Sequence, residues 1–193
     1  DTISFLNGEL SGITIQLEPI HPVGTAADST FKPPRMAPFL EAYLGCLKIS
    51  DEINASNKLT TSILRGLEYS PGGQFCGCSG RNFIVTAGGL ISACDEVTSL
   101  DQAGGDTFIF GDVTDGGIAF NEKAYNKLVG LSAEKASKCL NCFALYICRG
   151  GCPLSKVLCS RDLFHDEGPD CEGIKKSILK YLWYLAETEP DIG

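Results

Sequence analysis

Four closely spaced cysteines constrain this chain more than any other feature of its sequence. In the pattern C-x2-C-x5-C-x3-C, they are Cys139, Cys142, Cys148 and Cys152. Thiolates this near to one another can surround one or two metal centres, because the entropic cost of closing a loop grows slowly with its length. Gly150 and Gly151 precede the last cysteine, where they let the backbone approach a metal centre or adopt a positive φ. We therefore interpret this segment as metal-binding.

The spacing favours iron–sulfur ligation over zinc. Structural zinc sites usually take two cysteine pairs, or a cysteine pair and a histidine pair, from two short turns. Here one pair is followed by two single cysteines at unequal gaps, and in two-cluster ferredoxins the last cysteine of such a run binds the other cluster. The two histidines, His21 and His165, both lie outside the cysteine run. A Cys2His2 zinc site therefore has little support.

Composition and charge argue against two classes of partner. The 193 residues are 44% hydrophobic and 21% charged, which is typical of a globular protein with one good core or two small ones. The sequence has no apolar run of membrane-spanning length. The net charge is −8, and the 16 basic residues form no long run, which argues against a nucleic-acid surface. We expect no nucleic acid and no membrane among the partners.

The ten cysteines also indicate a compartment. Disulfides would require an oxidising environment, and the first residues do not resemble a secretory signal peptide. Cys76 and Cys78 are one residue apart, which is too close for an easy disulfide between them. We therefore expect reduced thiols in the cytoplasm. Asp1 stands where an initiator Met would be, so we treat the chain as a candidate fragment of a longer protein.

Hydrophobic periodicity predicts an α+β protein with two parts. Residues 12–18 alternate between apolar and polar side chains, which is typical of a strand with one buried face. Apolar residues recur at helical spacing over residues 37–53. Proline and glycine at 71–73 then break the pattern. We place a boundary there, with residues 1–70 as the N-terminal part and residues 71–193 as a cysteine-rich module.

Within the module, a predicted β-hairpin brings distant cysteines together. Residues 82–86 and 90–94 have the pattern of its two strands, with glycines at the turn between them. The hairpin returns Cys94 to the segment that carries Cys76 and Cys78. Three thiols that are separated in sequence can therefore converge on one site.

Short elements and loops alternate in the rest of the module. In order, we predict a strand at 107–110, a helix from the N-cap Asn121 to Val129, a further turn at 133–138 and irregular backbone at 154–169. Asp170 is the predicted cap of a closing helix. Cys171 lies in its first turn, where the positive end of the helix dipole favours a thiolate. Cys171 is therefore a candidate distant ligand.

Together these cysteines resemble a SPASM domain, the C-terminal extension of many radical S-adenosylmethionine enzymes that modify ribosomally made peptides or proteins. The family pattern is a cysteine, then G-x4-C, then C-x2-C-x5-C-x3-C, then a last cysteine. Cys76 or Cys78 begins it, and residues 89–94 supply the G-x4-C element. The run of four cysteines matches the third element without a gap, and Cys171 completes the pattern. The resemblance covers residues 75–175.

This resemblance implies two auxiliary [4Fe-4S] clusters. The second cluster would be bound by Cys139, Cys142, Cys148 and Cys171. The first would be bound by Cys94, Cys152 and one or both of Cys76 and Cys78. The family often spaces its two early ligands more widely, so the alternative to full cysteine ligation is an open iron site on the first cluster. Cys46 and Cys159 would remain outside both clusters.

Upstream, residues 13–19 and 24–26 are similar to a late strand and loop of the partial (β/α)6 barrel of these enzymes. The C-x3-C-x2-C run that binds the cluster that cleaves S-adenosylmethionine is absent from the sequence. The resemblance therefore implies the non-catalytic C-terminal part of a maturase, with S-adenosylmethionine bound only in the complete enzyme. The auxiliary clusters would transfer electrons or anchor a peptide or protein substrate.

Two alternatives from other classes remain open. A stand-alone iron–sulfur module would exchange electrons with a separate partner, and a structural zinc domain would use its thiolates only to fold. Other residues fit ordinary roles. We interpret Cys46 as a core residue, His165 as an exposed loop residue, and Tyr181, Trp183 and Tyr184 as packing residues of the closing helix.

Overall fold

A computed structural model describes residues 2–20, 30, 32, 34–64, 67, 72–164 and 170–188. The helices are α1 (Thr2–Glu9), α2 (Met36–Glu52), α3 (Gly105–Phe108), α4 (Glu122–Val129), α5 (Ser137–Leu140), α6 (Leu145–Cys148), α7 (Pro153–Ser160) and α8 (Cys171–Thr188), with a 3-10 turn at Ala133–Lys135. The strands are β1 (Thr14–Gln16), β2 (Lys58–Thr60), β3 (Ile84–Val85), β4 (Leu90–Ser92), β5 (Ile109–Thr114) and β6 (Gly117–Phe120). This mixture of helices and strands confirms the predicted α+β class.

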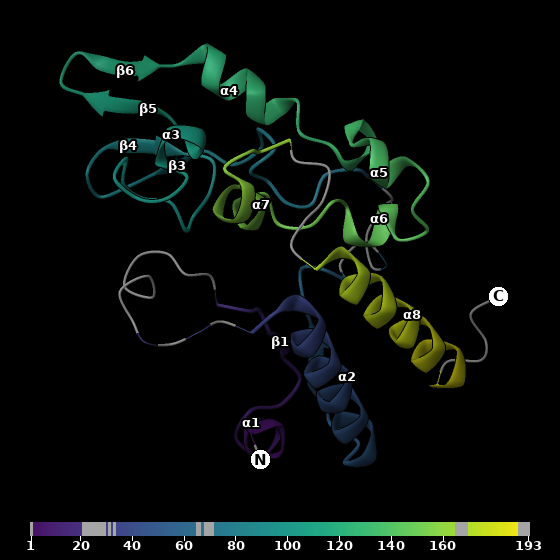
Figure 1. Cartoon of the computed structure of the whole chain (residues 1–193). Helices are drawn as coiled ribbons and strands as arrows, with labels where there is room; N and C mark the ends of the chain where they lie inside the picture. Colours follow the sequence, from purple (N-terminus) through teal and green to yellow (C-terminus); the bar gives the residue numbers. More distant parts are fainter. Residues whose placement is uncertain are drawn as a thin grey trace.

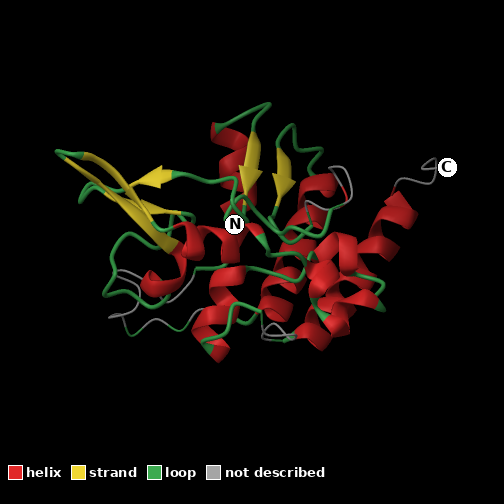
Figure 2. Cartoon of the chain, turned by 90° about the horizontal axis from the view of Figure 1, so that it is seen from above, coloured by secondary structure: helices red, strands yellow, loops and turns green. Residues whose placement is uncertain are grey.

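The elements are arranged around a central cysteine-rich region. Figure 1 shows the sheet of β3 to β6 with α4 at one end of the molecule and α1 and α2 at the other, with α5, α6 and the start of α8 between them. Figure 2 shows that the strand pair β1 and β2 is separate from the larger sheet. None of the described helices combines the length and the apolar character that a membrane span needs.

The strands β1 and β2 form a βαβ unit with α2. They pair in parallel, which requires a crossover connection, and α2 lies in that connection. Tyr43 on α2 holds the helix against the strands, because its buried hydroxyl donates a hydrogen bond of 3.0 Å to the carbonyl of Leu59. The strand predicted within residues 12–18 and the helix predicted over residues 37–53 are both confirmed. Two strands do not by themselves make a barrel.

One hydrophobic core, here called the helical core, draws on both ends of the chain. Its buried members are Ile3, Leu40, Tyr43, Leu59, Ile63, Leu64, Ala144, Ile174 and Ile178. They bring α8 against α2, so the closing helix packs on the N-terminal βαβ unit. On α8, the rings of Tyr181 and Tyr184 stack with centroids 6.2 Å apart. Trp183 is 64% exposed, so the packing role predicted for it is wrong.

The second core, here called the sheet core, covers one face of the antiparallel sheet. Its buried members are Cys78, Ile91, Ala93, Val97, Phe108, Ile109, Phe110, Leu128, Leu131, Leu154, Val157 and Leu163. The predicted hairpin is confirmed, because β3 and β4 pair antiparallel with Ile84 opposite Ser92. The predicted N-cap is also confirmed, since the Asn121 side chain accepts a 3.0 Å hydrogen bond from the backbone N–H of Ala124.

The strand predicted at 107–110 begins later than expected. The turn of α3 includes Phe108, and β5 runs from Ile109 through Gly111 to Thr114. Gly111 looks like a strand terminator in the sequence, but it serves close packing inside the sheet. A Cβ at this position would lie 2.5 Å from the carbonyl oxygen of Ala119 on β6.

The irregular backbone predicted at 154–169 is wrong for its first part. That part is the helix α7, in which Leu154 and Val157 are buried one turn apart in the sheet core. Pro153 stands at the first helical position, where its fixed φ and missing N–H cost nothing. Residues 165–169 lie outside the described residues.

Candidate metal centre

The first quartet of cysteines is Cys76, Cys78, Cys94 and Cys152. Cys78 belongs to the sheet core, and the other three are partly buried against it. The thiols of Cys76, Cys94 and Cys152 all lie near enough to Cys78 to act on it electrostatically. The hairpin therefore brings Cys94 to Cys76 and Cys78, as the sequence predicts, and the start of α7 adds Cys152.

Cys76 and Cys78 have different environments although one residue separates them. The Cys78 side chain is 2% exposed, and its thiol faces the sulfur of Cys76. The hydrogen bond between them lowers the pKa of Cys76 to about 7. The same hydrogen bond, together with burial, raises the pKa of Cys78 far above its usual value. In the metal-free chain, Cys76 is therefore the member of the pair that ionises first, and Cys78 keeps its proton.

Nearby polar groups hold Cys94 and Cys152 in place. The Ser92 hydroxyl donates a 2.9 Å hydrogen bond to the carbonyl of Cys94 and accepts one of 3.2 Å from its N–H. Burial raises the pKa of Cys94 to about 12, and the backbone N–H of Glu96 offsets part of this rise. Cys152 is the N-cap residue of α7. Burial raises its pKa, and polar hydrogens of Ser155 in the first turn of α7 oppose the rise.

The second quartet of cysteines is Cys139, Cys142, Cys148 and Cys171. Three of them follow one another through α5, the next turn and α6, and two short backbone hydrogen bonds close this segment. The N–H of Cys142 donates to the carbonyl of Cys139 at 3.0 Å. The N–H of Cys148 donates to the carbonyl of Ala144 at 2.8 Å. Burial and, to a smaller extent, the other three thiols raise the pKa of Cys148 to about 12.

The start of α8 brings Cys171 to the other three members. Asp170, just before the helix, has φ 70°, and its carboxylate accepts a 3.3 Å hydrogen bond from the backbone N–H of Ala37 on α2. Gly173 lets the two helices approach closely, since a Cβ there would lie 2.6 Å from the Cβ of Ala37. The candidate distant ligand therefore lies beside α5 and α6 because α8 begins against α2.

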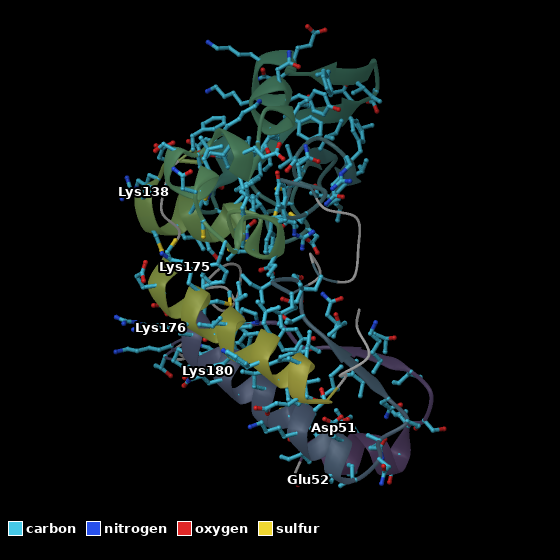
Figure 3. All side chains as sticks on the ribbon, turned by 90° about the vertical axis from the view of Figure 1, so that its right-hand side faces the viewer. Asp51, Glu52, Lys138, Lys175, Lys176 and Lys180 are labelled. Carbon is cyan, nitrogen blue, oxygen red and sulfur yellow. The ribbon has the colours of Figure 1, made fainter. Side chains whose placement is uncertain are left out.

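The second quartet lines a cavity of about 690 Å³. Cys152 of the first quartet and Cys159 also face this cavity, so it extends to the boundary between the two quartets. Figure 3 shows sulfur atoms between Lys138 on α5 and Lys175 on α8, two residues that line the cavity. Among the residues that the structure describes, no three His, Cys, Asp or Glu side chains lie close enough together to hold one metal ion.

The positive ends of three helices face this cavity. Its lining includes Met36 at the start of α2, Ser155 in the first turn of α7 and Cys171 at the start of α8. Each helix N-terminus carries the equivalent of about half a positive charge. The positive and negative side chains of the lining nearly balance in charge. They are Arg35, Lys138, Lys175, Asp170 and Glu172. The helix termini therefore favour a negatively charged occupant.

A left-handed turn joins the two quartets between Cys148 and Cys152. Its residues, Arg149, Gly150 and Gly151, have φ values of 51°, 78° and 76°. Glycine adopts such values readily, whereas a residue with a Cβ pays roughly 1–2 kcal/mol. The turn lets Cys148 join the second quartet while Cys152, only four positions later, joins the first.

The remaining cysteines and histidines are not members of either quartet. Cys46 lies on α2 against the helical core, and burial raises its pKa, in line with its predicted packing role. Cys159 is exposed on α7. His21 and His165 lie outside the described residues, as do residues 24–26 of the predicted barrel loop and Pro71 of the predicted domain boundary.

Sequence reasoning missed the residues that orient the ligands. The role of α7 could have been predicted, because Pro153 directly after Cys152 is a common helix start. Ser92 binds Cys94 two residues away, a local pattern that serine commonly forms, but the sequence alone did not single it out. The sequence indicates Asp170 only as a cap of α8, because the N–H of Ala37 that it binds becomes its neighbour only in the folded chain. Comparison of the chain with family models, with curated proteins and with solved structures gives no match. The fold and the site together therefore define the chain as an α+β protein with two cysteine quartets.

We expect the metal-free chain to lose stability as the pH rises above 9. Burial raises the pKa of Cys94 and of Cys148 to about 12, from an ordinary value of 9.0. Between these values the unfolded chain binds fewer protons than the folded chain. The free energy of unfolding then falls by up to about 1.4 kcal/mol per thiol for each pH unit.

Urea titrations at pH 8 and pH 10 measure this effect, with an expected loss of roughly 1–3 kcal/mol. The control is the Cys94→Ala, Cys148→Ala double variant, which lacks both thiols and should lose less stability over the same interval. Equal losses in the two proteins would show that other groups cause the pH dependence.

Proposed function

We propose that this chain is the auxiliary iron–sulfur domain of a radical S-adenosylmethionine enzyme of the SPASM class that modifies a peptide or protein. One observation carries the proposal. Eight cysteines from distant parts of the chain fall into two quartets, and their membership agrees with the ligand sets that the resemblance implies. Thiolates are the usual ligands of [4Fe-4S] clusters.

The residues present fit such clusters. Both quartets offer sulfur donors, which suit iron–sulfur centres, and the second quartet lines a cavity much larger than one ion. Helix N-termini around that cavity favour a negatively charged group. In the first quartet, Cys76, Cys94 and Cys152 would be ligands. Cys78 would either be the fourth ligand or remain a hydrogen-bond donor to Cys76.

Bound clusters would supply one-electron chemistry, and the surrounding protein would set how readily they accept the electron. The N–H of Glu96 near Cys94 and the polar hydrogens of Ser155 near Cys152 stabilise negative charge on these sulfurs. Burial of Cys148 and Cys152 acts in the opposite direction by disfavouring charge. These groups give the two quartets different environments, which suits a stepwise transfer of electrons.

The βαβ unit supports a place at the end of a partial (β/α) barrel. Its two parallel strands and crossover helix are the repeating unit of such barrels. The core that binds and cleaves S-adenosylmethionine would be supplied by the rest of the enzyme. This chain alone should therefore produce no 5′-deoxyadenosine, even when it is reduced and loaded with clusters.

Anaerobic purification and reconstitution with iron and sulfide test the proposal. We expect a brown protein with about eight irons and eight sulfides per chain, and electron paramagnetic resonance signals from two clusters after reduction. A colourless protein with stoichiometric zinc and no iron would overturn the proposal in favour of a structural zinc domain. Zinc would require the four sulfurs of a site to lie about 3.8 Å apart, given bonds of about 2.3 Å in a tetrahedron.

A further inference from the structure

Arg149 connects the two quartets. It directly follows Cys148 of the second quartet, and its side chain extends toward the first. The hydrogen bond from Cys78 is the main stabilising influence on the Cys76 thiolate. The positive charge of Arg149 adds to it, and the Asp95 carboxylate acts against it. A second cation, Lys156 on α7, acts in the same way on Cys148. Positive charge therefore lies on both sides of the turn that joins the quartets.

Two contacts hold the Arg149 guanidinium in place. One of its terminal nitrogens, Nη2, donates a 2.9 Å hydrogen bond to the backbone carbonyl of Ser62. The guanidinium carbon lies 5.7 Å from the centroid of the Phe75 ring, within the range of a cation–π interaction. Phe75 is the neighbour of Cys76, so the contact fixes the charge beside the first quartet.

Through Ser62, Arg149 also reaches the βαβ unit. Ser62 follows β2, and its N–H and hydroxyl donate hydrogen bonds of 2.6 and 2.7 Å to the Glu18 carboxylate, which follows β1. Both residues lie just beyond the carboxyl ends of the parallel strands. In parallel α/β proteins, this edge carries the functional site.

The backbone of Arg149 sets the direction of the chain between the quartets. The residue ends α6 in the left-handed conformation, with φ 51°, and the next two residues are glycines. A left-handed residue commonly closes a helix. The turn therefore leads the chain from Cys148 to Cys152, while the Arg149 side chain contacts Ser62 and Phe75.

These observations point to a role for Arg149 that rests on the proposed function. We propose that Arg149 is a positioning residue, which places a fixed positive charge beside the first quartet and thereby raises the midpoint potential of the first cluster. Reduction adds negative charge to a cluster, so a nearby cation stabilises the reduced form. The same side chain would tie the cluster to the carboxyl edge of the βαβ unit.

Redox titration of the cluster-loaded Arg149→Met variant, followed by electron paramagnetic resonance, tests the proposal. Methionine keeps an unbranched stem and removes the charge. We expect the midpoint potential of the first cluster to fall by about 59 mV, which is a tenfold change in the equilibrium constant for one electron. The midpoint potential of the first cluster in Arg149→Lys should lie between those of this variant and the unmodified chain. Lysine keeps the positive charge but lacks the planar guanidinium group.

Arg161→Met is a matched control. Arg161 also has a positive φ, of 56°, but it is exposed at the far end of α7 from Cys152. Loss of this solvent-screened charge should leave both potentials unchanged. Equal midpoint potentials of the first cluster in the Arg149→Met and Arg161→Met variants would overturn the inference, although the chain still holds two clusters.

The inference and the proposed function fail in different ways. Failure of the unmodified chain to bind iron would remove the proposed function. If the chain binds two clusters but the Arg149→Met and Arg161→Met variants have equal midpoint potentials, the charge effect of Arg149 is removed and the proposed function stands.

Discussion

Replacement of Cys148 by alanine should halve the iron content of the reconstituted chain, from about eight to about four atoms. Cys148 is a half-buried member of the second quartet, and the other three thiols of that quartet act on it. Its loss leaves three sulfurs around a large cavity, while the first quartet keeps all of its members. Iron and sulfide analysis, together with the resonance spectrum of the reduced protein, would measure the result.

Two further variants sharpen this experiment. Cys159→Ala removes an exposed thiol that lines the same cavity but belongs to neither quartet, so the iron content should stay near eight. Cys94→Ala should remove the other half of the iron and the other spectral component. The grouping into two quartets would be wrong if Cys94→Ala and Cys148→Ala abolished the same signal, or if neither changed the iron content.

Replacement of Ile178 by alanine should lower the free energy of unfolding by about 2–5 kcal/mol, because it removes a fully buried side chain and leaves a cavity. Ile178 is 0% exposed on α8, in the helical core that α8 shares with α2. A loss at the upper end of this range would be a large part of the stability of an ordinary domain. Chemical denaturation of the metal-free chain would measure the change.

Trp183→Ala is the matched control for Ile178. Trp183 lies on the same helix, but its side chain is 64% exposed, so we expect a change within about 0.5 kcal/mol. The contact of α8 with the N-terminal unit would be contradicted if Ile178→Ala and Trp183→Ala had equally small effects. In the cluster-loaded protein, Ile178→Ala should release iron from the second quartet first, since α8 carries Cys171.

Patterns that depend on local chemistry were predictable from the sequence. The hairpin followed from two alternating segments around glycines, and the cap of α4 followed from Asn121 before an amphipathic run. The hairpin also indicated that Cys94 would meet Cys76 and Cys78, whereas the full grouping was implied only by the family resemblance. In contrast, α7 was missed because its apolar positions cover only two turns. The strand predicted at 107–110 ended too early, because the role of Gly111 depends on a carbonyl of the neighbouring strand.

Long-range geometry could not be predicted in the same way. No sequence pattern shows that the Asp170 carboxylate meets the start of α2, or that Arg149 reaches Ser62. These contacts join segments that are far apart in sequence, and each depends on the packing of whole helices. The cysteine pattern was therefore visible in the sequence, whereas the groups that orient these cysteines became visible only in the fold.

The helical core has a consequence for how the polypeptide comes apart. Leu40 and Ile63 pack in it with Ile174 and Ile178, although more than a hundred residues separate the two pairs along the chain. A protease cut between residues 64 and 72 would therefore yield two pieces that stay bound to each other. Neither piece would be stable alone, because each would expose the apolar surface that the other piece now covers.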